Sequence, residues 1–192
     1  MRIEIGGKKY DVPVSWRELT YSRYIAALDY SLAGEGDPVG YLNAVTGIPV
    51  EVLNQTSIDG LAKIMTMVDF INNTDALMTY NVVDPNLKID IGTQPYWKLE
   101  ICNQEIKRVW NELYKDKKEL SEAEVMHVYM KCAPVFVKTY TEGLTYEVKK
   151  FFRKKKVVVE AIDIEDKPIP SVYGLAVFFC KLLRPLTLIT RK

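Results

Sequence analysis

Apolar and polar positions alternate along the first twelve residues, and a pair of glycines interrupts the alternation once. Residues 2–5 form the first alternating run and residues 8–12 form the second. Gly6 and Gly7 between them tolerate the positive φ that a two-residue turn requires, so we expect a β-hairpin. Pro13 has no N–H to donate to a strand ladder, and the second strand should end there.

From Leu19 onward the apolar spacing changes to threes and fours, which is typical of amphipathic helices. Asp37 and Pro38 are a favourable N-cap and first helical residue, and Gly47 is a favourable terminator, so a helix is expected between them. Ser57 or Thr56 can cap a later helix in the same way. The predicted helical segments in this part of the chain are 19–32, 38–46, 49–53 and 57–72.

The middle of the chain predicts two longer helices, over 95–117 and 120–143. Ser121 can cap the second helix, and acidic residues follow in its first turn, where the helix dipole favours them. Pro134 lies inside this helix and should kink or break it. One or two further helical turns are expected over 145–152.

Two short extended segments and a final helix complete the pattern. Residues 87–91 alternate, and we expect them to pair with the N-terminal hairpin into a small sheet. Residues 155–168 begin with β-branched side chains and should be extended. The last helix is expected over 171–184, ending before Pro185.

These elements predict an α+β fold that is mostly α-helical, with an N-terminal β-hairpin and a small sheet. A length of 192 residues fits a single domain, 1–192. A sub-boundary is expected near 73–86, which would separate the hairpin and helices of 1–72 from the helices and short strands of 87–192.

Charge and hydropathy exclude some classes of protein. The formal net charge of +1 is too small for a generally basic nucleic-acid binder. Residues 1–12 carry charges and have no apolar core, which predicts no signal peptide. The most apolar stretch, 172–189, contains Lys181, Arg184 and Pro185, so we expect no membrane span and no membrane partner.

Candidate catalytic chemistry is sparse in the sequence. The three cysteines, Cys102, Cys132 and Cys180, are far apart and form no CxxC, so we expect buried thiols and neither a disulfide nor a metal site. The single histidine, His127, lies in the middle of a predicted helix without a nucleophile motif. No phosphate-binding glycine loop is found. The sequence therefore predicts a protein that is not an enzyme and that uses no cofactor.

The first candidate site is a set of aromatic residues near the N-terminus. Tyr21 and Tyr24 are three residues apart and share a helix face, which either covers the hairpin or binds a partner protein. The full set is Trp16, Tyr21, Tyr24, Tyr30 and Tyr41, of which Trp16, Tyr21, Tyr24 and Tyr41 are the candidate partner-binding residues.

The second candidate site is the basic run "KKFFRKKK" at 149–156. It is either a solvated face, a protein contact or a phosphate-binding segment, in which Phe151 and Phe152 could stack on bases. An acidic run that includes Asp163 and Glu165 follows directly and could neutralise it. The candidate residues are Lys149, Lys150, Arg153, Lys154, Lys155 and Lys156.

The N-terminal part of the chain also resembles a known pattern. "IEIGGKKYDVPVSWRELTYSRYIAAL" is followed by "YLNAVTGIPVEVLNQTSIDGLAKIMTMVDFI". This order is similar to a hairpin with "GKxYxVP", then "W…T…Y", "LTGIP…L" and a capped apolar helix, in small proteins of tailed bacteriophages. Some of these are tail assembly chaperones. The resemblance covers roughly residues 2–72.

The resemblance implies a non-enzymatic bacteriophage assembly or virion structural protein, either chaperone-like or a head–tail or tail component. It implies contacts with phage structural proteins, with a homo-oligomer as a further option. The implied location is the host cytoplasm during assembly, or the virion. The alternative is a nucleic-acid-associated protein that uses the basic segment 149–156.

Overall fold

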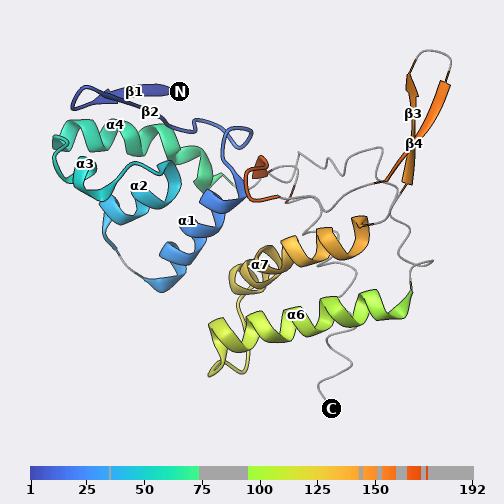
Figure 1. The fold of residues 1–192 in the computed structure, drawn as a ribbon. Coiled ribbons are helices and arrows are strands. Elements are labelled where there is room, and N and C mark those ends of the chain that lie inside the picture. Colours follow the sequence, from blue (N-terminus) through green and yellow to red (C-terminus); the bar gives the residue numbers. More distant parts are fainter. Residues whose placement is uncertain are drawn as a thin grey trace. The chain divides into compact units, whose positions relative to one another are not determined.

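The computed structural model describes residues 1–34, 36–73, 95–142, 145–150, 153–158, 164–169 and 172, with the backbone alone for the two ranges between 145 and 158. The described elements are mostly helices, with short antiparallel strands, so the fold is α+β as predicted (Figure 1). The chain divides into two compact units: Met1–Asn81 with Glu165–Val172, and Val82–Ile164 with Tyr173–Lys192. The division after Asn81 falls inside the range expected for a sub-boundary. The return of residues 165–172 to the first unit is not foreseen by the sequence pattern.

The first unit opens with the predicted hairpin. Strands β1 (Arg2–Ile5) and β2 (Lys8–Asp11) pair antiparallel. Gly6 and Gly7 connect them with φ values of 58° and 77°. Positive φ at both central residues matches the right-handed twist of the strands, and only glycine adopts it without strain. The expected third strand, 87–91, lies outside the described residues.

In the described part of the first unit, four helices and a 3₁₀ turn follow, close to their predicted bounds. The Asp37 carboxylate accepts hydrogen bonds from the N–H groups of Val39 and Gly40 at 3.1 and 2.9 Å, which satisfies two donors that a helix leaves unpaired. Ser57 is the cap that the structure uses at the later helix. The elements are α1 (Tyr21–Ala33), α2 (Pro38–Thr46), α3 (Val50–Asn54), α4 (Ile58–Val68) and η1 (Asp69–Asn72).

A distant segment of the chain caps helix α1. The N-cap residue Thr20 makes no side-chain capping bond. Instead, the N–H of Tyr21 donates to the Lys167 carbonyl at 2.9 Å, and the N–H of Ser22 donates to the Glu165 carbonyl at 3.1 Å. Thr20 and Pro168 form an isolated antiparallel bridge, and the segment lies beside the start of α1 (Figure 1). The positive end of the α1 dipole is therefore satisfied by residues that lie more than 140 positions later in the chain.

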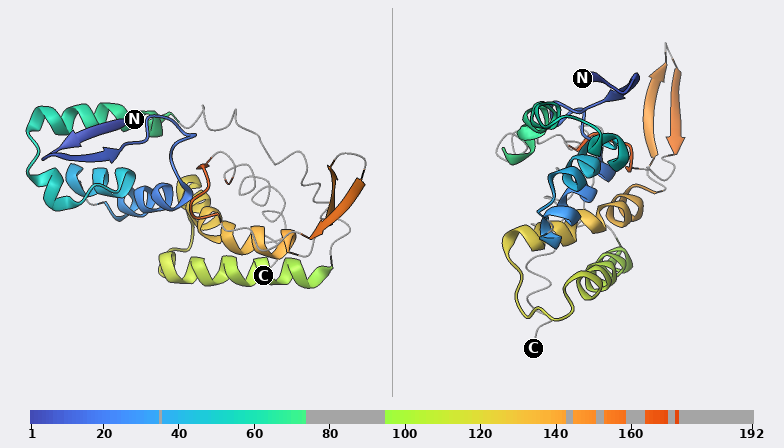
Figure 2. Two further views of the ribbon diagram at one scale, coloured as in Figure 1. Left: turned by 45° about the horizontal axis from the view of Figure 1, so that its top comes forward. Right: turned by 90° about the vertical axis from the view of Figure 1, so that its left-hand side faces the viewer.

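The second unit contains a pair of long helices, α6 (Tyr96–Tyr114) and α7 (Glu122–Thr141), which run alongside one another (Figure 2). Ser121 and Glu124 form a complete capping box at the start of α7, which confirms the predicted cap. The core between the helices consists of Cys102, Ile106, Val109, Val128, Tyr129, Cys132, Phe136 and Tyr140.

Helix α7 continues through Pro134, so a break is wrong, and the kink that the sequence also allows at this position stays a prediction. Proline costs a helix about 3 kcal/mol because it removes one hydrogen bond and clashes with the preceding turn. Cys132, Phe136 and Val137 on either side of it are fully buried. Their burial stabilises the helix by more than the proline costs, since each large apolar side chain contributes about 1.5–3 kcal/mol.

Residues 145–150 form a strand, which corrects the expectation of further helical turns. Strand β3 (Thr145–Lys150) pairs antiparallel with β4 (Arg153–Val158). β4 confirms the first part of the extended segment expected at 155–168. The final helix expected at 171–184 lies outside the described residues, apart from Val172.

Candidate functional site

Three of the four candidate partner-binding aromatic residues are inside the first unit. Trp16 is 3% exposed, and Tyr21 and Tyr24 are each 5% exposed. The rings of Trp16 and Tyr24 meet edge to face with centroids 5.7 Å apart, and Trp16 meets Phe70 in the same way at 5.4 Å. The Trp16 indole N–H donates to the Asn73 carbonyl at 3.2 Å.

These contacts correct the expectation that Trp16, Tyr21 and Tyr24 form a docking surface. A buried indole needs both apolar neighbours and an acceptor for its N–H, and the fold supplies both. Trp16 therefore holds the end of η1 against the start of α1. Of the two readings that the sequence left open, packing within the fold is the one that the structure supports.

Tyr30 and Tyr41 lie nearer the surface of the same unit. The Tyr30 hydroxyl donates to the Asp37 carbonyl at 2.9 Å, and its ring lies against Gly40. Tyr41 is half-buried. Its loss of solvent raises the pKa of its hydroxyl, and the charge of Asp69 adds to this effect. Among the four candidates, Tyr41 alone keeps part of its side chain accessible.

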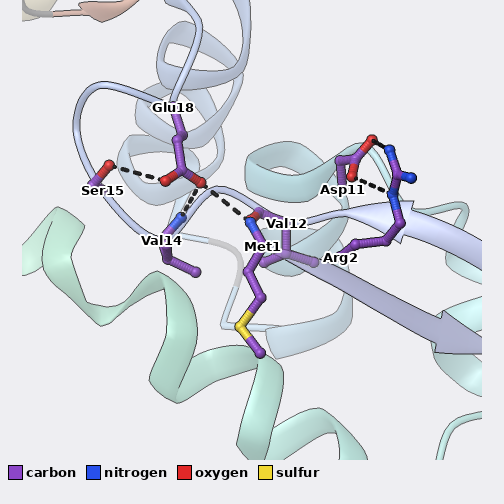
Figure 3. A network of polar contacts seen from close by, with 7 residues as sticks. All are labelled: Met1, Arg2, Asp11, Val12, Val14, Ser15 and Glu18. Atoms are coloured by element: carbon purple, nitrogen blue, oxygen red, sulfur yellow. Dashed lines mark hydrogen bonds and ion pairs between the residues drawn. The ribbon is translucent and has the colours of Figure 1, made fainter.

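A polar network surrounds the start of the chain (Figure 3). The Glu18 carboxylate accepts from the Met1 ammonium group and from the N–H of Val14, both at 3.2 Å, and from the Ser15 hydroxyl at 3.4 Å. Hydrogen bonding to Val14, and then to the ammonium group, lowers the pKa of Glu18. A carboxylate held in its ionised form by fixed donors is a poor general acid at neutral pH.

A pocket of about 310 Å³ lies beside this network, and its lining residues are Met1, Asp11, Val12, Pro13, Glu18 and Arg23. Asp11 pairs with Arg2 at 2.9 Å across the hairpin, and this bond lowers the pKa of Asp11. Both carboxylates of the pocket therefore already have partners within the first unit, and this region is better explained as structural than as catalytic.

The single histidine has a structural place in the second unit. His127 is 3% exposed, and its Nδ1 lies 2.8 Å from the Tyr114 hydroxyl. Next to it, the Lys117 ammonium group pairs with Glu124 and lies 5.7 Å from the centroid of the Tyr114 ring. These contacts join the end of α6 to the start of α7, and a buried histidine here fits packing better than proton transfer with a substrate.

The two cysteines in the described part of the chain are also buried. Burial raises the pKa of the Cys102 thiol to about 12, and the Glu105 charge adds to the shift. The pKa of Cys132 is raised by the same cause. Because the thiolate is the reactive form, both thiols are poor nucleophiles at neutral pH, as predicted for structural cysteines. Cys180 lies outside the described residues.

The start of α6 exposes large apolar side chains that the sequence reading does not single out. Tyr96 is 72% exposed, Trp97 is 56% exposed and Ile101 is 38% exposed. Between Trp97 and Tyr140 lies the ammonium group of Lys98, which is 5.8 Å from the centroid of each ring, while the residue as a whole is 8% exposed. The signal in the sequence was the i,i+4 pair Trp97 and Ile101, which does not match the core spacing of the helix.

The candidate basic residues lie at the end of the β3–β4 hairpin next to its connection. The register places Lys149 opposite Lys154, and Lys150 opposite Arg153. Lys155 is opposite Val148, and Lys156 is opposite Glu147. The basic run is therefore folded back on itself as a two-stranded ribbon, not extended as a single segment.

The described part of the chain shows neither a metal-binding cluster nor a membrane-spanning helix. No group of three or more His, Cys, Asp or Glu side chains is placed there so that it could hold a metal ion. None of the helices described has the length and apolar character needed to cross a bilayer.

The architecture defines a mostly helical α+β protein whose candidate surfaces are an aromatic patch and a basic ribbon. No protein-family model, curated protein or solved structure matches the chain.

Proposed function

We propose that this chain is a non-enzymatic bacteriophage assembly or virion structural protein that acts through protein–protein contacts. The resemblance of residues 2–72 to tail assembly chaperone-like proteins is one support. In this proposal the partners are phage structural proteins, and the protein works in the host cytoplasm during assembly or in the virion.

The residues that carry the resemblance have roles in folding. Gly7 forms the hairpin turn, Val12 and Trp16 are buried, and Gly47 ends α2 with a φ of 70°. Ile48, which follows it, is fully buried. A shared pattern made of such residues supports a shared fold, and it leaves the contact surface to be found elsewhere on the chain.

The observation that carries the proposal is the exposed aromatic patch of Tyr96, Trp97 and Ile101 at the start of α6. Tryptophan and tyrosine are enriched among the residues that dominate binding energy in protein interfaces. A tryptophan that is more than half exposed leaves a large apolar area in water, and its burial against an apolar segment of a phage tail protein would be favourable. We assign this patch as the contact for such a segment.

The test is capture of phage proteins from infected cells with the full chain, tagged at its C-terminus. We expect a phage structural protein, identified by mass spectrometry, to be enriched by the unmodified chain. The variant with Tyr96→Ala and Trp97→Ala should reduce the enrichment at least tenfold. Ile58→Ala is the matched control, because Ile58 is 85% exposed in the first unit and lies outside the patch.

Mass spectrometry of purified virions distinguishes a component of the particle from a protein that acts only during assembly. The proposal would be overturned if the chain were a monodisperse monomer that captured no phage structural protein and was absent from virions. Equal capture by the patch variant and the unmodified chain would refute the assignment of the α6 patch as the contact surface.

A further inference from the structure

The β3–β4 hairpin concentrates positive charge at one end. In the four opposed pairs nearest its connection, six of the eight residues are basic. In the two pairs next to the connection all four are basic: Lys149 with Lys154, and Lys150 with Arg153. This clustering is a property of the register, because it places two basic runs of the sequence directly opposite each other.

The N-terminal hairpin shows the opposite arrangement. In β1–β2, Arg2 is opposite Asp11 and Glu4 is opposite Lys9. The first of these pairs is an ion pair at 2.9 Å. The charges of that hairpin therefore support its own strand pairing.

Like charges at opposed positions destabilise an antiparallel pair, and a hairpin of two strands is only marginally stable by itself. The basic pairs of β3–β4 oppose the pairing that brings them together. A polyanion bound along the ribbon would remove this repulsion and stabilise the strand pairing.

We propose that the β3–β4 ribbon binds the phosphate backbone of double-stranded nucleic acid. An antiparallel strand advances about 3.4 Å per residue and its successive residues face opposite sides, so positions on one face repeat about every 7 Å. This spacing corresponds to every second phosphate of one DNA strand along the helix axis. The register places three basic positions on each face of the ribbon: Lys150, Arg153 and Lys155 on one, and Lys149, Lys154 and Lys156 on the other. A two-stranded ribbon also has the width that the major groove admits.

The acidic run that follows the hairpin is the competing explanation within the chain. Of its residues, Glu165 and Asp166 are exposed at the start of the segment that caps α1. If this run neutralised the ribbon, removing its charges would strengthen binding to DNA. The chain variant Asp163→Asn with Asp166→Asn measures this competition, and it should change the affinity less than substitutions in the ribbon do.

The experiment is a fluorescence anisotropy titration of a labelled 30-base-pair DNA duplex with the full chain, at several KCl concentrations. Each phosphate contact releases bound counterions, so the logarithm of the association constant falls as log [KCl] rises. Four to six contacts predict a slope of about −4 to −5. Between 50 and 200 mM KCl this slope weakens binding by roughly 10²- to 10³-fold.

The test variant replaces the four residues Lys149, Lys150, Arg153 and Lys154 by threonine, which favours strands. We expect the salt dependence of its association constant to be less steep, with a slope smaller in magnitude by about 3 to 4. The matched control makes the same change in net charge at four dispersed, exposed positions: Lys8→Thr, Lys63→Thr, Lys107→Thr and Lys115→Thr. The control should keep most of the slope.

Two further variants separate charge from folding. The variant Lys149→Arg, Lys150→Arg and Lys154→Arg keeps the charge and should keep the affinity. The variant with only two substitutions, Lys150→Thr and Arg153→Thr, should reduce the magnitude of the salt slope by about half as much as the variant with four substitutions.

Four results would overturn the proposal. They are failure of the full chain to bind the duplex, equal loss in the dispersed control, loss of binding in the arginine variant, or tighter binding to anionic vesicles (phosphatidylcholine with phosphatidylserine) than to the duplex. None of these results depends on the capture of phage proteins through the α6 patch, so the two proposals fail separately.

Discussion

The segment that caps α1 can be tested at Ile169. Its side chain is fully buried, and its N–H donates to the Leu19 carbonyl at 2.9 Å. Truncating a fully buried isoleucine to alanine costs 2–5 kcal/mol in well-packed cores, so about 3 kcal/mol is expected for Ile169→Ala. The loss falls on the contact between residues 165–172 and the N-terminal part of the first unit.

Hydrogen exchange measures this loss where it occurs. The N–H groups of Tyr21 and Ser22 donate to carbonyls of the segment, so their exchange reports its detachment. A loss of about 3 kcal/mol raises the population of the detached state by about 10²-fold, and exchange at these two amides should rise accordingly. Amides beside Phe136 and Tyr140, in the core of the second unit, should keep their protection and serve as the internal reference.

Lys167→Ala is the matched control for this prediction. Lys167 is exposed and takes part through its backbone carbonyl, so removal of its side chain should leave the exchange of Tyr21 unchanged. Urea unfolding followed by circular dichroism should show the same order of stability in the first unit. If Ile169→Ala left exchange at Tyr21 and Ser22 as slow as in the unmodified chain, the assignment of 165–172 as the cap of α1 would be refuted.

Two further predictions concern one residue in each unit. A Cβ added at Gly40 would lie 2.5 Å from the Tyr30 hydroxyl oxygen, so Gly40→Ala should lower the free energy of unfolding by about 1–2 kcal/mol in thermal melts. In a Tyr30→Ala background the same change should be neutral or stabilising, because alanine has a higher helix propensity than glycine. An equal cost in both backgrounds would contradict this explanation. Hydrogen bonds from Lys117 and, to a smaller extent, from Ser121 lower the pKa of Glu124 to about 2. The ionised Glu124 therefore stabilises the fold above the ordinary carboxyl pKa of 4.5, and this stabilisation is lost as the pH falls toward 2. Urea melts from pH 7 to pH 2.5 should therefore be less dependent on pH in Glu124→Gln, and identical pH profiles would refute the assignment.

Local signals predict much of the first unit. Asp37, Pro38 and Gly47 fix α2 because each acts within one or two residues of the helix end. The Gly6-Gly7 turn is equally local, because its backbone conformation depends on the two residues themselves. Where neighbouring residues determine the local backbone conformation, the amino-acid pattern is enough to predict the element.

The elements that the sequence mispredicts depend on distant contacts. The sequence 145–150 is a strand because it pairs with β4, and the pattern of its own residues does not specify that partner. α7 persists at Pro134 because the side chains around it are buried. The aromatic spacing of Tyr21 and Tyr24 predicts a shared face correctly, but it does not tell whether that face meets solvent or core.

The docking of residues 165–172 also bears on how the resemblance over 2–72 should be used. That resemblance includes Leu19 and Tyr21, whose backbone groups bond to Ile169 and Lys167. It does not include the segment that makes these bonds, nor the fully buried Ile169 side chain. A protein that had only the N-terminal pattern would leave the first N–H groups of α1 to other acceptors and this part of its core uncovered. The first unit of this chain is therefore complete only when residues 165–172, which follow Val82–Ile164 of the second unit in the sequence, are in place. Folding of the N-terminal part consequently depends on a segment that its own sequence motifs do not include.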